Sequence, residues 1–422
     1  MQEPSSTQGR LFGARVAKWC IYLLIGFPII NYALNLWFRN SLGPLWNEIV
    51  LGLLSLIALI RYIKGHRPAL FGWSKFAWWY ILFCTGMLFM GLASPSVSSS
   101  GFGLDVQYMA FGLLLPFVVD IEEIPKYLHA AVLVSALLAV DGVFQYVIKV
   151  PIPSNWLDVG ENVRTRVFSV YGSPAEFGAN FEMMLPIMFG LFLTTKNRFL
   201  RVLYIFAVLC SLAALVFTFD RGSWLGIGLA VLLVAVFFDR RLLILFSVLA
   251  LLALLLPAVQ HRITDLLSPV YYIKSAQGGR ILRWEQAFNK MVSNPLFGAG
   301  LGRYGGGIAA VRGFSLYSDS YYAKVLGETG IVGLVLFISI HVAVVREMVK
   351  TVVKRARGLN RYLALAGLTG TLAIIVHNFV ENLYEYPPTV LLYYLMVGFF
   401  LLWGRSLKNK QDEVLPSSKH PV

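Results

Sequence analysis

The chain has 422 residues, of which 57% are hydrophobic and only 14% are charged, and its formal net charge is +14. A soluble protein of this length carries more charge, so the composition excludes a soluble globular fold. The spacing of the three cysteines, Cys20, Cys84 and Cys210, fits neither a disulfide framework nor a metal site.

Apolar runs long enough to cross a bilayer recur along the whole chain. We therefore expect an all-α polytopic membrane protein, with residues 1–422 forming a single transmembrane domain of about twelve transmembrane helices. The first span is too long for a cleaved signal peptide, so we expect it to be retained. The predicted spans are 15–36, 45–63, 74–93, 102–119, 126–148, 174–194, 200–218, 222–238, 241–258, 321–345, 360–380 and 386–404.

The basic clusters fall on one side of this topology when the N-terminus is placed in the cytoplasm. By the positive-inside rule, both termini are then cytoplasmic. The positive charge is explained by topology, and we expect no nucleic acid among the partners. The clusters are Arg61/Lys64/Arg67, Lys196/Arg198/Arg201, Arg240/Arg241 and Lys350/Lys354/Arg355/Arg357/Arg361.

The longest predicted connection, 259–320, lies between the ninth and tenth helices on the extracytoplasmic side. It contains a short amphipathic helix with Trp284, Phe288 and Met291 on one side, followed by a glycine-rich turn over 297–307. The turn matches the GxGxxG pattern, but no βαβ unit surrounds it, so a dinucleotide site is excluded. We expect this connection to be a lid on the membrane surface.

Arg221 lies in a short turn that the topology places at the extracytoplasmic surface, where arginine is disfavoured. It stands at a helix start, and the free N–H groups there, together with a guanidinium, suit a phosphate ligand. The alternative is a pair with Asp220, or contact with lipid headgroups.

Further arginines precede the tenth helix. Arg280 and Arg283 lie on adjacent turns of one helix, and Arg303 and Arg166 could converge on them. Together with Arg221 they would form a cationic pocket that binds a pyrophosphate and stabilises it as a leaving group. The alternative is a basic loop that contacts anionic lipid headgroups.

Asp319 directly precedes the tenth helix, where it is either the N-cap, the commoner role, or a general base. Its neighbour Tyr321 is a candidate for substrate binding. His377 lies near the outer end of an apolar helix, with Glu381 and Glu385 following at helical spacing. Ionisable groups at membrane depth suggest function, although a packed histidine is the plain alternative. The metal-like spacing is weak, and we expect no metal and no cofactor.

These motifs resemble the O-antigen ligase and polymerase superfamily. Segment 219–225 is similar to its S-R-G-aromatic/small-L stretch, and 279–302 to its R-x-x-x-W and P-x-x-G-x-G-x-G signature. Segment 319–330 is similar to its H-N-x-Y-L and E-x-G-x-x-G stretch, and 166–178 to an upstream segment with an arginine. Order and spacing agree from about residue 160 to 400, as the family's arrangement of motifs requires.

The resemblance implies a GT-C-type membrane glycosyltransferase at the outer, periplasmic face of the bacterial inner membrane, acting on glycans linked to polyprenyl (undecaprenyl) pyrophosphate. It implies that Arg221 and Arg280 bind the donor pyrophosphate and that residue 319 helps to activate the acceptor hydroxyl. The family usually has histidine where this chain has Asp319. That difference favours a polymerase over a ligase, and His377 could supply the missing imidazole.

The predicted activity is a metal-independent, inverting transfer that polymerises the repeat units of an O-antigen or exopolysaccharide. A ligase acting on lipid A core is the alternative. Expected partners are the lipid-linked donor, an acceptor glycan or glycolipid, membrane lipids, and a chain-length regulator and flippase. A lipid-linked glycan transporter is the competing class. It would line a path through the membrane with its arginines, whereas a transferase would gather them at one face.

Overall fold

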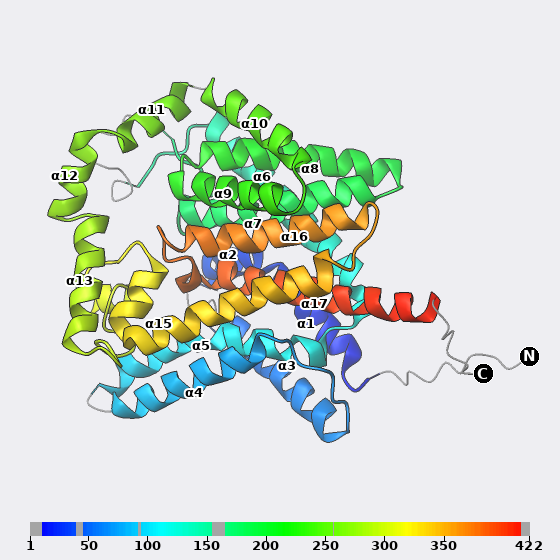
Figure 1. The fold of residues 1–422 in the computed structure, drawn as a ribbon, viewed down its shortest axis with the longest axis horizontal. Coiled ribbons are helices and arrows are strands. Elements are labelled where there is room, and N and C mark those ends of the chain that lie inside the picture. Colours follow the sequence, from blue (N-terminus) through cyan, green and yellow to red (C-terminus); the bar gives the residue numbers. More distant parts are fainter. Residues whose placement is uncertain (1–10, 39–44, 92–93, 154–164, 256, 415–422) are drawn as a thin grey trace, which may run out of the picture.

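The computed structural model describes residues 11–38, 45–91, 94–153, 165–255 and 257–414, and within these ranges the chain is built of helices without a strand (Figure 1). The predicted all-α class is thereby confirmed. The first half contains α1 (Ala14–Ile25), α2 (Phe27–Phe38), α3 (Trp46–Ile63), α4 (Ser74–Met90), α5 (Pro95–Val118), η1 (Ile121–Glu123), α6 (Ile124–Val147), α7 (Pro174–Thr194) and α8 (Arg198–Phe217). The second half contains α9 (Arg221–Phe237), α10 (Arg241–Leu254), α11 (Pro257–Leu266), α12 (Pro269–Gln277), α13 (Arg280–Ser293), α14 (Gly307–Val311), α15 (Tyr321–Glu347), η3 (Met348–Val353), α16 (Asn360–His377), η4 (Leu383–Glu385) and α17 (Pro387–Val414).

Seven of the described helices are long and apolar enough to cross a membrane, or eight if the bent pair α1 and α2 counts as one span. The predicted count of about twelve is not confirmed. Some predicted spans fall on shorter helices: α4 and α9 have 17 residues each and α10 has 14. The first predicted span is broken after α1, where the chain bends by 78° at Gly26.

Close packing of α7, α9 and α16 forms the part of the bundle that supports the site. Small residues allow these helices to approach each other, as is common between membrane helices. A Cβ atom at Gly370 of α16 would lie 2.7 Å from the carbonyl oxygen of Met183 on α7. A Cβ atom at Gly226 of α9 would lie 3.0 Å from the carbonyl oxygen of Ala373 on α16. Glycine at these positions therefore sets the spacing of the three helices.

The predicted lid loop 259–320 is largely helical. Helices α11, α12 and α13 follow one another along one side of the bundle, at the left of Figure 1. The amphipathic helix expected there is α13, which ends at the predicted Asn294. The apolar residues Trp284 and Phe288 of α13 are exposed, which suits a helix that rests on a bilayer surface.

Helix α15 is interrupted at Gly330, whose backbone leaves the helical region with φ 64° and ψ −164°. The glycine-rich turn bonds to the backbone around this interruption. The amides of Ala299 and Gly300 donate to the carbonyls of Gly327 and Glu328 at 2.8 and 2.9 Å. The segment before α15 is thus joined to that helix through its main chain, and α15 begins at the left of the bundle in Figure 1.

Candidate active site

The N-terminus of α15 carries the first charged group. The predicted N-cap role of Asp319 is wrong, because Ser320 caps the helix by accepting from the amide of Ala323. Asp319 instead takes a left-handed backbone conformation with φ 49°. Such a conformation is uncommon for a residue with a side chain.

The carboxylate of Asp319 joins two of the predicted arginines. Arg283 donates from Nη1 to Asp319 Oδ2 at 2.7 Å, and Arg280 Nε lies 3.8 Å from the same oxygen. Both arginines come from the first turn of α13, whose N-cap is Gly279. The structure therefore brings Arg280, Arg283 and Asp319 together, with all three side chains only partly exposed.

The turn between α8 and α9 holds a second charged group. Asp220 caps α9 by accepting from the amide of Ser223 at 2.8 Å, and Arg221 is the first residue of that helix. Arg166 donates from Nε to the carbonyl of Thr218 at 3.1 Å, so that its charge lies beside Asp220. Burial opposes ionisation of Asp220, but His377, Ser223 and Arg166 outweigh it and lower the pKa of this carboxyl.

His377 connects this turn to the interior of the bundle. Its Nδ1 lies 2.6 Å from Glu182 Oε1 on α7, and its Nε2 lies 3.4 Å from Asp220 Oδ2. The imidazole is 1% exposed, so it faces two carboxylates and no solvent. Two such neighbours suit an imidazole that carries a proton on both nitrogens.

A short turn after α16 links the two groups. The amide of Tyr321 donates to the carbonyls of Asn378 and Glu381 at 2.9 and 3.2 Å, which fixes the turn against the start of α15. Glu381 is half-buried, and the charges of Asp319, Arg280 and His377 all act on its carboxyl. The predicted helical spacing of His377, Glu381 and Glu385 is wrong, because α16 ends at His377.

A buried ionic cluster lies beneath these residues. The ammonium of Lys324 lies 2.6 Å from Asp105, 3.1 Å from Glu328 and 3.5 Å from Glu385. All four side chains are at most 4% exposed. Glu385 also accepts from the amide of Gly307 at 2.8 Å. The cluster therefore ties α5, α15 and η4 to the glycine-rich turn.

The side chain of Tyr321, a predicted substrate-binding residue, lies apart from the arginine group, whereas the turn that carries Arg303 adjoins it through a bond from the Tyr304 hydroxyl to the carbonyl of Arg283. The hydroxyl of Tyr321 donates to Asp105 at 2.9 Å, and its side chain is only 2% exposed, so it belongs to the buried ionic cluster. Arg303 lies half-buried in the glycine-rich turn, and its side chain lies near Gly300.

Sequence reasoning missed the partners Glu182, Lys324 and Asp105. Each is a charged residue inside an apolar helix, which is itself a functional signal at membrane depth. The partner of each residue, however, comes from a distant part of the chain. Lys324 and Asp105, for example, are 219 positions apart.

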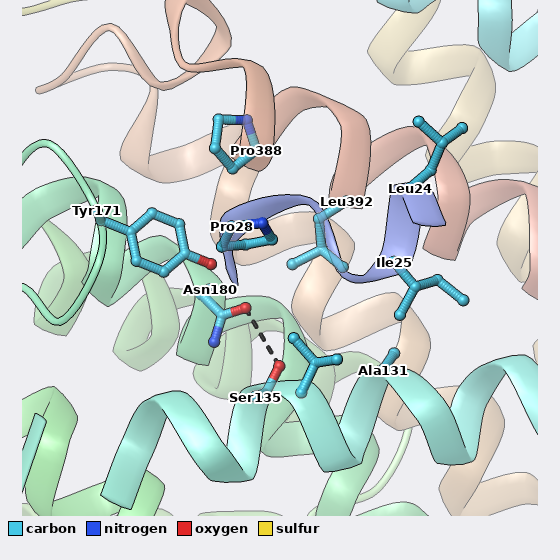
Figure 2. A pocket seen from close by; sticks show the side chains of 10 residues that line it. Leu24, Ile25, Pro28, Ala131, Ser135, Tyr171, Asn180, Pro388 and Leu392 are labelled. Carbon is cyan, nitrogen blue, oxygen red and sulfur yellow. Dashed lines mark hydrogen bonds between the residues drawn. The ribbon is translucent and has the colours of Figure 1, made fainter. Parts of the chain in front are cut away.

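A small cavity lies among α1, α2, α6, α7 and α17 (Figure 2). In it, Ser135 donates to the side-chain oxygen of Asn180 at 3.2 Å, and the Tyr171 hydroxyl points toward Asn180 (Figure 2). The space left holds about one water molecule, so the cavity is too small for a sugar.

Taken together, helices and charges define a polytopic helical membrane protein with arginines and carboxylates gathered at one end of the bundle. Residues 205–338 match the family described as O-antigen ligase. The match supports the O-antigen ligase and polymerase superfamily for this chain and confirms the resemblance found in its motifs. The matched segment includes Arg221, Arg280 and Asp319, whereas Arg166 and His377 lie outside it. A search of curated proteins found no match.

Proposed function

We propose that this protein is a glycosyltransferase that moves an oligosaccharide from a polyprenyl pyrophosphate donor to an acceptor sugar hydroxyl. The observation that carries the proposal is the meeting of Arg280, Arg283 and Asp319 in one group. This group and the turn between α8 and α9, which Arg166 contacts and which Arg221 follows, both adjoin the segment from His377 to Glu381.

The chemistry of a pyrophosphate leaving group fits these side chains. Guanidinium groups form paired, charge-assisted hydrogen bonds with phosphate oxygens. They stabilise the charge that develops when the glycosidic bond to the pyrophosphate breaks. In-line attack by the acceptor hydroxyl inverts the anomeric centre, and no metal takes part in the proposed step. Asp319 orients Arg280 and Arg283 for this task.

Helix directions support a site on the extracytoplasmic face. Both α9 and α15 begin in the charged region and run away from it for 17 and 27 residues. At 1.5 Å per residue, α9 alone extends about 26 Å, close to the thickness of the hydrocarbon core. The basic clusters around Arg240 and Lys350 therefore lie at the other end, where the positive-inside rule places the cytoplasm.

A polymerase that joins repeat units is our first assignment, because an aspartate occupies position 319 where ligases usually carry histidine. The description of the matched family favours the second candidate, a ligase that attaches the glycan to a lipid A core. Gathering of arginines at one end of the bundle counts against a transporter.

The proposal is tested by transfer from a purified polyprenyl-pyrophosphate glycan in detergent or liposomes. We expect Arg221→Ala and Arg280→Ala to lower the transfer rate about 10²–10³-fold, the range typical for the loss of one group that stabilises developing charge. We expect Asp319→Asn to lower it as well, because Arg280 and Arg283 lose their shared partner.

The exposed Arg312, in the same outer segment, provides the matched control, and Arg312→Ala should transfer at the wild-type rate. Undiminished transfer in all three site variants would refute the proposal. Mass spectrometry of the product separates chain extension from attachment to a lipid core, and so decides between polymerase and ligase.

A further inference from the structure

We infer that Glu381 is the general base of the transfer and removes the proton from the acceptor hydroxyl. The inference rests on the proposed function and names a residue that the sequence motifs did not select as catalytic. Three steps support it: the bonding of Asp319, the burial of His377, and the position of Glu381 between them.

Asp319 is already engaged. Its Oδ2 accepts from Arg283 at 2.7 Å and lies 3.8 Å from Arg280 Nε. A carboxylate that accepts a hydrogen bond from one guanidinium group and lies close to a second has its negative charge balanced, which weakens it as a proton acceptor. If Asp319 took a proton, it would also release the arginines needed for the leaving group. Asp319 is therefore a positioning residue.

His377 is out of reach of a substrate. Its imidazole is 1% exposed, and its two nitrogens face Glu182 and Asp220. A Cβ atom at Gly222 would lie 2.3 Å from its Nε2, so the start of α9 covers the ring. An imidazole that holds protons on both nitrogens offers no lone pair to an incoming hydroxyl. Its contribution is a fixed positive charge near Glu381.

Glu381 has the placement that a base requires. It is half-buried, and its carboxyl accepts from the amide of its neighbour Asn382 at 3.1 Å. Its own carbonyl accepts from the amide of Tyr321, so its backbone is held two residues from Asp319. The Glu381 carboxyl lies next to the arginines without being paired to them directly. It can therefore contact the acceptor sugar while the arginines hold the pyrophosphate of the donor.

The groups that face Glu381 come from every neighbouring element. They are Arg280 on α13, Asp319 and Tyr317 before α15, His377 on α16, and Tyr386 before α17. Burial and the charge of Asp319 together raise the pKa of the Glu381 carboxyl to about 7, against the opposing effect of Arg280 and His377. A base with a pKa near the working pH combines a useful ionised fraction with good proton affinity.

The proposed step balances as follows. The acceptor hydroxyl gives its proton to the Glu381 carboxylate, and its oxygen forms a bond to the anomeric carbon of the donor. The bond from that carbon to the pyrophosphate oxygen breaks with its electron pair. Polyprenyl pyrophosphate leaves as the anion bound by the arginines, and Glu381 later releases its proton to water.

The test compares pH–rate profiles of purified wild type, Glu381→Gln and Asp319→Asn with a polyprenyl-pyrophosphate glycan donor. In the wild type, the rate should rise with pH through about 7, as the base ionises. Glu381→Gln should lower kcat about 10²–10⁴-fold and abolish that rise. Asp319→Asn should keep the rise and chiefly weaken donor binding, which appears as a higher KM.

Glu285→Gln, which changes an exposed carboxylate on α13, is the matched control and should behave as wild type. Glu381→Asp keeps a carboxylate and should retain the pH-dependent rise at a lower rate, which separates loss of the base from misfolding. The inference would be overturned if Glu381→Gln kept the increase of rate with pH. It would also be overturned if only Asp319→Asn lost that increase. In that case, loss of activity in Arg280→Ala would still support the proposed function. Full activity in the arginine variants would refute both the proposed function and the role of Glu381.

Discussion

Gly222→Ala places a methyl group directly against the imidazole of His377. The new Cβ atom would lie 2.3 Å from Nε2 and 2.8 Å from Cδ2 of the ring, where an ordinary contact begins at 3.4 Å. The ring must retreat by about 1 Å, because carbon and nitrogen cannot approach closer without steep repulsion. Glu182, which lies 2.6 Å from Nδ1, blocks part of that movement.

The expected cost has two parts. Forcing an added methyl group into a packed site costs about 1–3 kcal/mol of stability. A displacement of about 1 Å in a catalytic site lowers rates by roughly 10²-fold. We therefore expect Gly222→Ala to unfold at a lower temperature in detergent and to transfer glycan far more slowly than the wild type.

Gly228→Ala is the matched control, because Gly228 lies in the same helix and a Cβ atom there would meet only Phe246, at an ordinary 3.6 Å. Both substitutions add one methyl group to α9, and only the one at Gly222 meets His377, so a larger loss there reports that contact. If the two variants match each other in thermal unfolding and in transfer rate, the assigned role of the His377 contact is refuted.

Lys324→Met should lower the free energy of unfolding by about 3–5 kcal/mol in a denaturation experiment, because buried carboxylates lose their counter-charge, whereas Lys350→Met at an exposed position should change little. Gly298→Ala should destabilise the protein more than Gly313→Ala in thermal unfolding. Both glycines have a left-handed backbone, but only a Cβ atom at Gly298 would meet a carbonyl oxygen, at 2.5 Å. Equal losses of stability would contradict the close packing at Gly298. The pKa of Glu381 is raised to about 7, so the folded state binds this proton more tightly than the unfolded chain does. The free energy of unfolding should therefore fall as pH rises from about 4.5 to 7. Glu381→Gln should reduce that dependence when unfolding is measured as a function of pH.

Local patterns predicted the helices that begin or end at strong signals. The amphipathic spacing around Trp284 located α13, and the polar run before Tyr321 located the start of α15. Hydropathy alone did not detect the bend at Gly26, because an apolar run continues through it. It also could not distinguish a long loop from the short helices α11 and α12, because their 10 and 9 residues are fewer than a periodicity argument needs.

The arginines of the site could be found from the sequence, since each is a charge near a membrane surface. Their partners could not. The contact between His377 and Glu182 joins residues 195 positions apart, and no local spacing encodes such a pair. The N-cap of α15 is Ser320 and not Asp319, because Asp319 has a left-handed backbone conformation. The sequence does not reveal that conformation.

The break at Gly330 has a consequence for how such an enzyme can diversify. The glycine-rich turn docks there through amide and carbonyl groups, which every residue except proline can supply. The buried side chains of Leu301 and Tyr304 add to this attachment, whereas Arg303 is half-buried. A substitution at Arg303 can therefore change the surface that the turn offers to a ligand while the backbone bonds hold the turn in place.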